Sequence, residues 1–326
     1  MTKISVIMCT YNGERYLTEQ LDSIAMQTRP PDELVIVDDH SSDNTPELLR
    51  DYARTSPLSI HIHENKTNLG YKANFLKALG LGTGDLLFLA DQDDVWAPEK
   101  VAVFACVFAM NPKAAVVYSD SHLVDSGGRC LGSTLWQSLR FCTQEQARLQ
   151  SASGFELCFR RGNLFCGCSM ALTRRFRDIA LPYPHTMQHD LWLGNLACTT
   201  EQLALLDTPL IAYRQHGAQT SGDKTPTIKN RIRGKLKATK TFSDTRYYDL
   251  WIDEHEALEQ RLRDLGYSAK PALHYLEDKI AYLRCQRTIH GGGRLARLPR
   301  IAEQVTTGRH RRFGRGLKSL LVDLLM

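Results

Sequence analysis

Residues 85–96, "DLLFLADQDDVW", are the stretch that decides the fold class. Five consecutive apolar residues run directly into three carboxylates, Asp91, Asp93 and Asp94. A short apolar run with polar residues on both sides is typical of a strand buried on both faces of a parallel sheet. Burying neighbouring carboxylates without partners would cost several kcal/mol each. The stretch therefore predicts a buried strand that ends in an acidic loop with a charge-balancing partner.

The first half of the chain alternates between strand and helix patterns. Apolar or alternating runs predict strands at residues 4–8, 33–39, 58–64 and 85–90. Helices are predicted at residues 15–27, from 43 or 44 onward, at 70–82 and at 97–110. This order implies a mostly parallel α/β sheet with helices on both faces. Ligands of such sheets bind beyond the carboxyl ends of the strands, where polar clusters stand at residues 9–13, 38–43 and 91–94.

The second half divides into two parts. Strands are expected at residues 114–120, 167–173 and 210–217, a helix at 189–200, and a loop-rich segment at 121–162. After Thr225 the sequence becomes helix-forming and rich in charge. We therefore expect a catalytic α/β domain over residues 1–222 and an α-helical, basic extension over residues 223–326.

Composition and cysteine usage narrow the class of protein. The chain has 326 residues, 43% of them apolar and 24% charged, which is typical of a globular protein. Nine scattered cysteines and a start at Met1 without a secretory signal predict reduced thiols and a cytoplasmic location. Cys166 and Cys168 are interpreted as core residues, because no second pair stands at zinc-site spacing. No apolar stretch reaches the roughly 20 residues that span a bilayer.

The acidic loop suits a divalent cation. Mg²⁺ and Mn²⁺ take hard oxygen ligands, usually one or two carboxylates, and leave positions for phosphate oxygens. An alternative is that Asp93 and Asp94 only stabilise the N-terminus of the following helix. Neither a P-loop nor a G-x-G-x-x-G stands in the sequence, so the kinase and dinucleotide-binding classes lose their main support.

Four ordered motifs carry a family resemblance: "ISVIMCTYNGERYLTEQLDSIAMQT", "ELVIVDDHSSDNT", "NLGYKANFLKAL" and "LLFLADQDDVWAPEKV". Together they resemble family-2 glycosyltransferases of the GT-A fold, a Rossmann-like nucleotide-diphospho-sugar transferase architecture, over roughly residues 1–220. Downstream, "CGCSMALT", "HDLWLGNLA" and "YRQHG" are similar to the subset that includes bacterial rhamnosyltransferases of O-antigen and related surface polysaccharides.

The resemblance implies a nucleotide pocket at the strand ends. Asp39, with Asp38 nearby, would accept the imide N–H of uracil or thymine, although one of the pair could instead cap the following helix. A generic turn is the alternative at Asn68 and Gly70. The implied nucleotide- and donor-binding residues are Thr10, Tyr11, Asn12, Asp38, Asp39, Asn68, Gly70, Lys72 and Asp91.

The resemblance also implies a metal site and a base. Asp91 and Asp93 match the D-x-D motif, with Asp93 as direct ligand, and His216 matches a histidine that contacts metal or diphosphate. The family mechanism is an in-line, inverting displacement, in which Asp190 would be the base unless it merely caps its helix. The residues placed near donor sugar or acceptor are Trp96, Gly167, Cys168, Ser169, His189, Trp192 and Arg214. His189 stands where the family usually has an acid. For the two tryptophans, the alternative is packing in the core.

The positive net charge of +5 is concentrated in the C-terminal tail. Residues 291–326 carry eight Arg or Lys against Glu303 and Asp323. Phe313, Leu317, Leu320, Leu321, Leu324 and Leu325 fall on one helical face. This stripe suits an anionic membrane surface, but also docking on the chain's own helices or on a second subunit. Nucleic-acid binding fits poorly, because the positive residues lack interleaved aromatic residues.

These observations predict a metal-dependent, inverting glycosyltransferase that requires Mg²⁺ or Mn²⁺. The leading donor is dTDP-rhamnose and the next is a UDP-hexose; the acceptor is a saccharide or a polyprenyl-diphosphate-linked glycan at the inner face of the cytoplasmic membrane. A nucleotidyltransferase would normally show a Gly-rich basic loop after its first strand, and "CTYNGERY" is not one. A non-catalytic nucleotide-sugar binder would not need Asp190.

Overall fold

The computed structural model describes residues 2–162, 164–184, 187–200, 202–217, 245–267, 271–292, 294–314, 320 and 323–324. The chain divides into two compact units, Met1–Gly222 and Asp223–Met326. The first unit carries two β-sheets, and the second is built of helices.

The first unit is built on a seven-stranded sheet with the order β10-β6-β9-β4-β1-β2-β3. Its strands are β1 Ile4–Thr10, β2 Glu33–Asp38, β3 Ile60–Glu64, β4 Leu86–Ala90, β6 Val116–Ser119, β9 Met170–Thr173 and β10 Leu203–Leu206. Strand β9 runs antiparallel to its neighbours β4 and β6, whereas the other pairs are parallel. The expected mostly parallel sheet is therefore confirmed. Every residue of β2 and β4 is buried, as their unbroken apolar runs predict.

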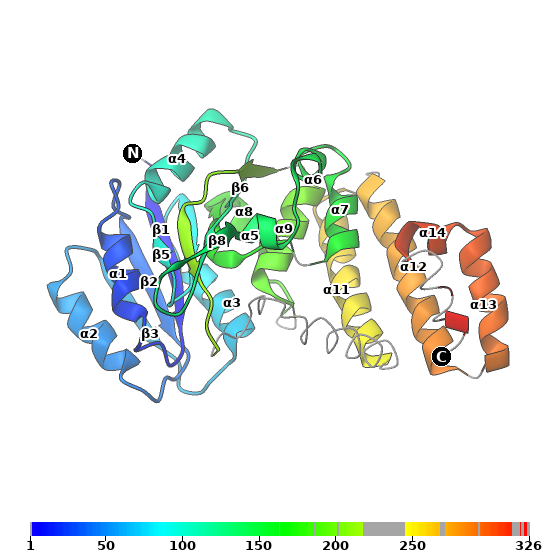
Figure 1. Cartoon of the computed structure of the whole chain (residues 1–326), viewed down its shortest axis with the longest axis horizontal. Coiled ribbons are helices and arrows are strands. Elements are labelled where there is room, and N and C mark those ends of the chain that lie inside the picture. The colour runs from blue at the N-terminus through cyan, green and yellow to red at the C-terminus, as the bar shows by residue number, and fades with distance from the viewer. Residues whose placement is uncertain are drawn as a thin grey trace. The chain divides into compact units, whose positions relative to one another are not determined.

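Helices cover both faces of this sheet. Figure 1 shows α1 (Leu17–Ala25) and α2 (Thr45–Thr55) on one side of strands β1 to β3, and α3 (Tyr71–Leu81) on the other. Further helices are α4 Lys100–Met110, α5 Leu135–Ser138, α6 Thr143–Leu149, α7 Gly154–Arg161, α8 Arg174–Ala180 and α9 His189–Thr199. A 3₁₀ turn, Gly167–Ser169, precedes β9. The chain first adds β2 and β3 on one side of β1 and then returns to add β4 on the other side. With right-handed crossovers, this reversal places the helices before and after it on opposite faces of the sheet.

A second, four-stranded sheet corrects two expectations. It has the order β5-β11-β7-β8, with β5 Val95–Trp96, β7 His122–Val124, β8 Cys130–Thr134 and β11 Ile211–Arg214. Residues 121–162 therefore contain two strands and three short helices where a loop-rich segment was expected. In addition, β5 separates the acidic loop from α4, whose first residue is Lys100. Glu99 occupies the cap position of α4 and its first turn holds no acidic residue, so neither Asp93 nor Asp94 stands at the N-terminus of that helix.

The second unit is helical. Its elements are α11 Thr245–Asp264, α12 Pro271–Gly291, α13 Arg294–Thr306 and α14 Arg309–Phe313, drawn from yellow to red in Figure 1. Tyr248, Ile252, Tyr282 and Leu283 form its core, with Phe313 packed against them. No helix among the described residues has the length and apolar character needed to cross a membrane.

The amphipathic tail is only partly described. Phe313 packs against Tyr275, with 5.0 Å between ring centroids, and Asp323 is 2% exposed. Leu320 is partly buried and Leu324 is 43% exposed, whereas Leu317, Leu321 and Leu325 lie outside the described residues. The described part of the tail therefore packs on the chain's own helices.

Candidate active site

The ends of three adjacent strands meet at one edge of the main sheet. β1 lies between β2 and β4, so the segments after Thr10, Asp38 and Ala90 are neighbours. The backbone N–H of Asp39 donates to the Thr10 carbonyl over 2.8 Å. Burial, and then the charges of Asp91 and Asp39, raise the pKa of Cys9, because both carboxylates lie near its thiol. The polar clusters expected to converge therefore do so.

Four carboxylates crowd this edge. Burial raises the pKa of Asp91 well above its ordinary value, and the charges of Asp94, Asp93 and Asp190 raise it further. Asp94 is fully buried, and burial followed by the charge of Asp93 raises its pKa to about 7. Like charges held this close favour a proton or a cation between them. Asp190, which is distant in sequence, thus faces the acidic loop.

Asp93 is paired with His216. The Asp93 Oδ2 lies 2.7 Å from His216 Nε2, and both side chains are mostly buried. His216 lies two residues after the end of β11, a strand of the second sheet. That sheet therefore brings the histidine to the acidic loop. A carboxylate and an imidazole that converge on one point suit a divalent cation of borderline hardness such as Mn²⁺. His216 Nε2 and Asp93 Oδ2 are hydrogen-bonded to each other here, and the role of this pair as metal ligands stays a prediction.

Arg214 holds the acidic loop in place. Its backbone N–H donates to Asp94 Oδ1 over 3.1 Å, and its Nε donates to the Asp93 carbonyl over 2.8 Å. Its guanidinium also donates to Glu19 Oε2 and lies 4.6 Å from the Tyr16 ring. The Arg214 side chain is 2% exposed, so these protein contacts cover a residue that was expected near the donor sugar or acceptor. Arg214 instead positions the two acids.

Asp190 lies in the first turn of α9. Gln188 occupies the cap position of this helix. The alternative that Asp190 only caps α9 is therefore wrong. Its Oδ1 accepts from the Leu191 N–H over 2.7 Å. Burial raises the pKa of Asp190 to about 6, opposed by backbone hydrogen bonds, including one from Gly167, and by the charge of Lys72. A carboxylate with a pKa just below neutrality suits a general base.

His189 is a packed, neutral residue. It is 6% exposed, and its ring stacks on Phe75 with 3.9 Å between centroids. A Cβ at Gly167 would lie 2.3 Å from His189 Nε2, so only glycine leaves room for the ring. Neither ring nitrogen has a hydrogen-bond partner among the described residues, and burial lowers the pKa of His189 to about 3. His189 therefore adds no charge beside Asp190, and its ring is covered by protein.

Asp38 and Asp39 hold loops together. Asp38 accepts from Thr10 Oγ1 and from the N–H and hydroxyl of Ser41, at 2.6–2.8 Å. Asp38, Thr10 and Asp39 are all buried, so their expected contact with the nucleotide stays a prediction. Asp39 accepts from Asn65 Nδ2 and from the N–H groups of Leu69 and Gly70, each over 2.8 Å.

These two acids do not cap α2. That helix begins at Thr45 with Asn44 at its cap position. The capping alternative for Asp38 and Asp39 is therefore wrong. Asp39 Oδ2 accepts the Gly70 N–H, and a carboxylate oxygen has lone pairs for more than one donor. Asp39 itself is 2% exposed.

The remaining pocket residues come from turns beside these acids. Tyr11 is 50% exposed, and its backbone N–H and carbonyl both bond to the Gln92 side chain. Asn12 has a φ of 48°, and its Oδ1 accepts from the Ser42 N–H. Asn68 donates to the Asp39 carbonyl, and Gly70 caps α3 at a φ of 80°, which favours glycine. The segment is thus a specific turn organised by Asp39 rather than a generic one. Lys72 follows in the first turn of α3.

Four residues expected near the donor sugar or acceptor are core residues. Trp192 is 1% exposed, and its Nε1 donates to the Ala180 carbonyl. Trp96 is 3% exposed, and Lys100 Nζ lies 3.4 Å from its ring centroid. Ser169 and Cys168 are also buried. Protein covers both tryptophan rings, as the alternative of packing in the core expects.

Lys100 is the residue that sequence reasoning missed. It is fully buried, and its Nζ donates to the Cys168 carbonyl over 2.8 Å. Burial lowers the pKa of Lys100 to about 7, against the opposing charges that include Asp94 and Asp91. A single lysine in the apolar stretch "APEKVAVFACVFAM" was the available signal. Its long side chain reaches the acidic loop from beneath.

The comparisons with known proteins agree with this architecture. The family model described as "Glycosyl transferase family 2" matches residues 5–175, which is more than half of the chain. The chain belongs to glycosyl transferase family 2. The expected family is thereby confirmed.

Among curated relatives, an uncharacterized glycosyltransferase of Nostoc sp. is 26% identical over 220 residues, 66% of each chain. An uncharacterized protein of Mycobacterium tuberculosis is 32% identical over 127 residues, which is 38% of this chain and 37% of the relative. A glucosyl-dolichyl phosphate glucuronosyltransferase of Haloferax volcanii is 31% identical over 117 residues, 35% of this chain and 37% of the relative. This family-2 chain thus spans between about a third and two thirds of the length of these relatives.

Solved structures share the fold. Residues 1–349 of S. aureus TarS in complex with UDP-GlcNAc match with a TM-score of 0.53 at 19% identity, covering 87% of this chain and 90% of that one. The mannosyltransferase of Pyrobaculum calidifontis in complex with GDP-Man and Mn²⁺ matches with a TM-score of 0.52 at 18% identity, covering 99% and 86%. The expected α/β GT-A architecture with a helical C-terminal region is confirmed.

Proposed function

We propose that this family-2 chain transfers a sugar from a nucleotide-diphosphate donor to a hydroxyl acceptor, with inversion and in dependence on a divalent cation. The observation that carries the proposal is the meeting of Asp190 with the acids of the D-x-D motif. A group that can accept a proton thus faces groups that can hold a cation. In-line transfer needs both, because a proton leaves the acceptor as negative charge develops on the leaving diphosphate.

Asp190 accepts the proton of the acceptor hydroxyl. The acceptor oxygen bonds to the anomeric carbon while the bond from that carbon to the diphosphate oxygen breaks, so the transfer needs no other reactant. With a pKa of about 6, Asp190 is mostly ionised at neutral pH. Lys72 lies close enough to lower that pKa, and in this position it also attracts the diphosphate.

The cation site consists of Asp93, Asp91 and His216. Asp93 and His216 converge within 2.7 Å, and Arg214 fixes the backbone from which Asp93 projects. A bound Mg²⁺ or Mn²⁺ would stabilise the charge of the leaving diphosphate. The Mn²⁺ bound with GDP-Man in the Pyrobaculum calidifontis mannosyltransferase supports the proposal by analogy of fold.

The donor is proposed to be dTDP-rhamnose, with a UDP-hexose as the second candidate. The carboxylate of Asp39 is proposed to accept the imide N–H shared by thymine and uracil. The similar TarS structure holds UDP-GlcNAc and the Pyrobaculum calidifontis structure holds GDP-Man, so the choice of a pyrimidine base rests on Asp39 and on the sequence motifs. The resemblance of "YRQHG" and "HDLWLGNLA" to rhamnosyltransferase motifs supports rhamnose.

The acceptor is proposed to be a glycan on a polyprenyl diphosphate, as in the synthesis of surface polysaccharides, reached at the inner face of the cytoplasmic membrane. The Haloferax volcanii relative, whose name includes dolichyl phosphate, supports a lipid-linked substrate. The exposed Arg311 supports contact with an anionic surface, whereas Arg309 and Arg312 are paired with Asp278. A self-association of the helical unit is the alternative use of its apolar stripe.

A donor panel tests the proposal. The purified chain is incubated with dTDP-rhamnose, UDP-hexoses and GDP-mannose, each with Mg²⁺, Mn²⁺ or EDTA, and release of the nucleoside diphosphate is measured. We expect release from a dTDP- or UDP-sugar only when the cation is present. Release that is unaffected by EDTA would overturn the cation dependence. Binding of every donor without turnover, in the presence of lipid-linked acceptor, would favour a non-catalytic binder.

A further inference from the structure

A second set of possible metal ligands lies beneath the acidic loop. Carboxylate oxygens of Asp91 and Asp94 and the sulfur of Cys168 lie within 4.8 Å of one another. They come from two segments, the loop after β4 and the 3₁₀ turn before β9. Ligand atoms around one tetrahedral cation are on the order of 3.5 Å apart, given metal–ligand distances of about 2.0–2.3 Å. Small side-chain rotations would therefore bring the three atoms to one cation.

One of these atoms is buried without a partner. Asp94 is fully buried, and its Oδ1 accepts the Arg214 N–H. Its Oδ2 has no hydrogen-bond partner of ordinary geometry among the described residues. A buried carboxylate oxygen in this state costs free energy that a ligand would recover. The weak thiol donor of Cys168, which faces Asp94, does not remove that cost.

Cys166 extends the set by one sulfur. Its Sγ lies 3.4 Å from the Cys168 Sγ, and both cysteines are free thiols. Two carboxylates and two thiols form a mixed oxygen and sulfur set. Zn²⁺ and Cd²⁺ favour sulfur-containing sets, whereas Mg²⁺ prefers oxygen alone. The donor chemistry thus differs from that of Asp93 and His216.

The charges around the set suit a divalent cation. Two carboxylates and the Cys168 thiolate would carry three negative charges. Lys100, whose Nζ is 2.8 Å from the Cys168 carbonyl, supplies one positive charge. A divalent cation supplies the other two, and the thiol proton leaves to solvent as the metal binds. The buried cluster would then be neutral.

We propose that Asp91, Asp94 and Cys168 form a binding site for a thiophilic divalent cation such as Zn²⁺ or Cd²⁺, with Cys166 as an additional ligand. The site does not depend on the proposed function. Because Asp91 also belongs to the proposed diphosphate–cation site, occupation of the sulfur site inhibits sugar transfer, and this consequence does rest on the proposed function.

The test is a titration of the reduced, full-length chain with Cd²⁺, followed by the ultraviolet sulfur-to-cadmium charge-transfer absorption. We expect saturation at one equivalent in the native chain. Cys168→Ser and Asp94→Asn each weaken binding at least tenfold, and Cys168→Ser also reduces the absorption per bound ion. Circular dichroism and thermal unfolding confirm that each variant is folded.

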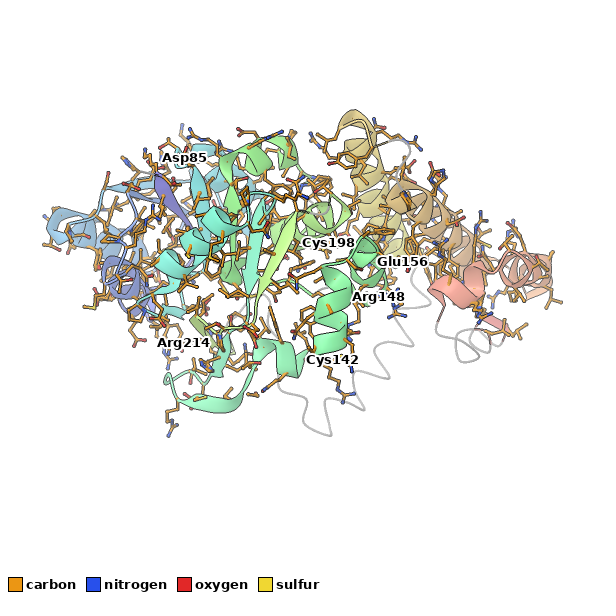
Figure 2. The ribbon with its side chains drawn as sticks, turned by 90° about the horizontal axis from the view of Figure 1, so that it is seen from above. Asp85, Cys142, Arg148, Glu156, Cys198 and Arg214 are labelled. Atoms are coloured by element: carbon orange, nitrogen blue, oxygen red, sulfur yellow. The ribbon has the colours of Figure 1, made fainter. Side chains whose placement is uncertain are left out.

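Two other cysteines serve as matched controls. Cys142 is exposed, and Cys198 is buried beside Cys158 with 3.0 Å between their sulfurs. Figure 2 shows both labelled residues well separated from Arg214, whose backbone contacts the acidic loop. Replacing Cys142 or Cys198 by Ser leaves the first equivalent unchanged. The proposal is overturned when Cys168→Ser keeps native affinity and absorption, or when Cys198→Ser abolishes them.

Discussion

The strand-end loop of the first unit and the C-terminal segment of the second treat their acids in opposite ways. In the loop, the charges of Asp94 and Asp93 raise the pKa of Asp91, and the charge of Asp93 raises the pKa of Asp94. In the helical unit, Asp323 meets Gln286 and His290 at 3.0 Å each. Balanced charges stabilise a fold, whereas crowded like charges lower its stability until something binds. The difference shows that the like charges in this part of the chain gather at the proposed active site.

Among the bases the contrast is only partial, because burial also lowers the pKa of Lys279 in the helical unit, to about 8. Asp278 pairs with both Arg309 and Arg312, on the face where Phe313 packs. Lys100, by contrast, lies fully buried beneath the acidic loop with a pKa lowered to about 7. Variants in both regions test whether the crowded like charges of the loop serve function and the paired charges of the helical unit serve stability.

The largest effect is expected for Asp190→Asn. Removal of the base should lower sugar transfer about 10³-fold while donor binding is retained, because general bases contribute 10²–10⁴-fold. Turnover is measured with the best donor of the panel, and donor affinity by calorimetry. Asp178→Asn, on an exposed side chain of α8, is the control and should leave both unchanged. Wild-type turnover in Asp190→Asn would show that the base is another residue.

Asp93→Ala should have the next largest effect. We expect the cation-dependent part of nucleoside-diphosphate affinity to fall by about 10–100-fold, because a direct ligand is lost. Calorimetry with and without Mn²⁺ measures it. Asp85→Asn is the matched control, since Asp85 lies at the opposite end of β4, far from Arg214 in Figure 2. Equal affinities of Asp93→Ala and the native chain in Mn²⁺ would count against the metal assignment.

Asp323→Ala should affect stability alone. Without this buried carboxylate, Gln286 and His290 each lose a hydrogen-bond partner. The free energy of unfolding should therefore fall by about 1–3 kcal/mol. Urea unfolding of the helical unit measures the change, and donor binding should stay at the native value. Asp264→Ala, on an exposed residue of α11, is the control. A loss of donor binding in folded Asp323→Ala would break the division between the two regions.

The smallest effect is a pH dependence. The pKa of Asp190 is raised to about 6, so its carboxylate is ionised above pH 6 and protonated below it. Because only the ionised form accepts a proton, kcat/KM should fall about tenfold per unit as pH drops below 6. The profile is measured at saturating Mn²⁺. A rate that stays constant down to pH 4.5 would exclude Asp190 as the base.

Much of the fold could be predicted from local pattern, because buried parallel strands are continuous apolar runs. β1, β2 and β4 begin and end within a few residues of their expected bounds. The short strands β5, β7 and β8 were not predictable in this way. Their residues acquire a strand conformation only by pairing with each other and with β11, which pairs with β5 across more than a hundred positions.

The candidate site shows the same division. The motif acids and Asp190 were visible as residue types at strand and helix ends, and the structure brings them together. The identity of neighbours was not visible, so Arg214, Trp96 and Trp192 were expected beside the donor and are in fact covered by protein. Lys100 was missed because its partners, Cys168 and the acidic loop, are contributed by other segments.

The sequence by itself determined the main buried strands, the helices between them and the acidic character of the strand ends, because these follow from local periodicity and residue type. Its four ordered motifs carried the resemblance to the family. Only the tertiary structure decided which polar groups are buried and which meet. Burial and proximity depend on how distant segments pack. They separate Asp93, paired with His216, from Asp94, whose neighbour is Cys168. The charge states of the site follow from that packing, since pKa values respond to burial and neighbouring charge.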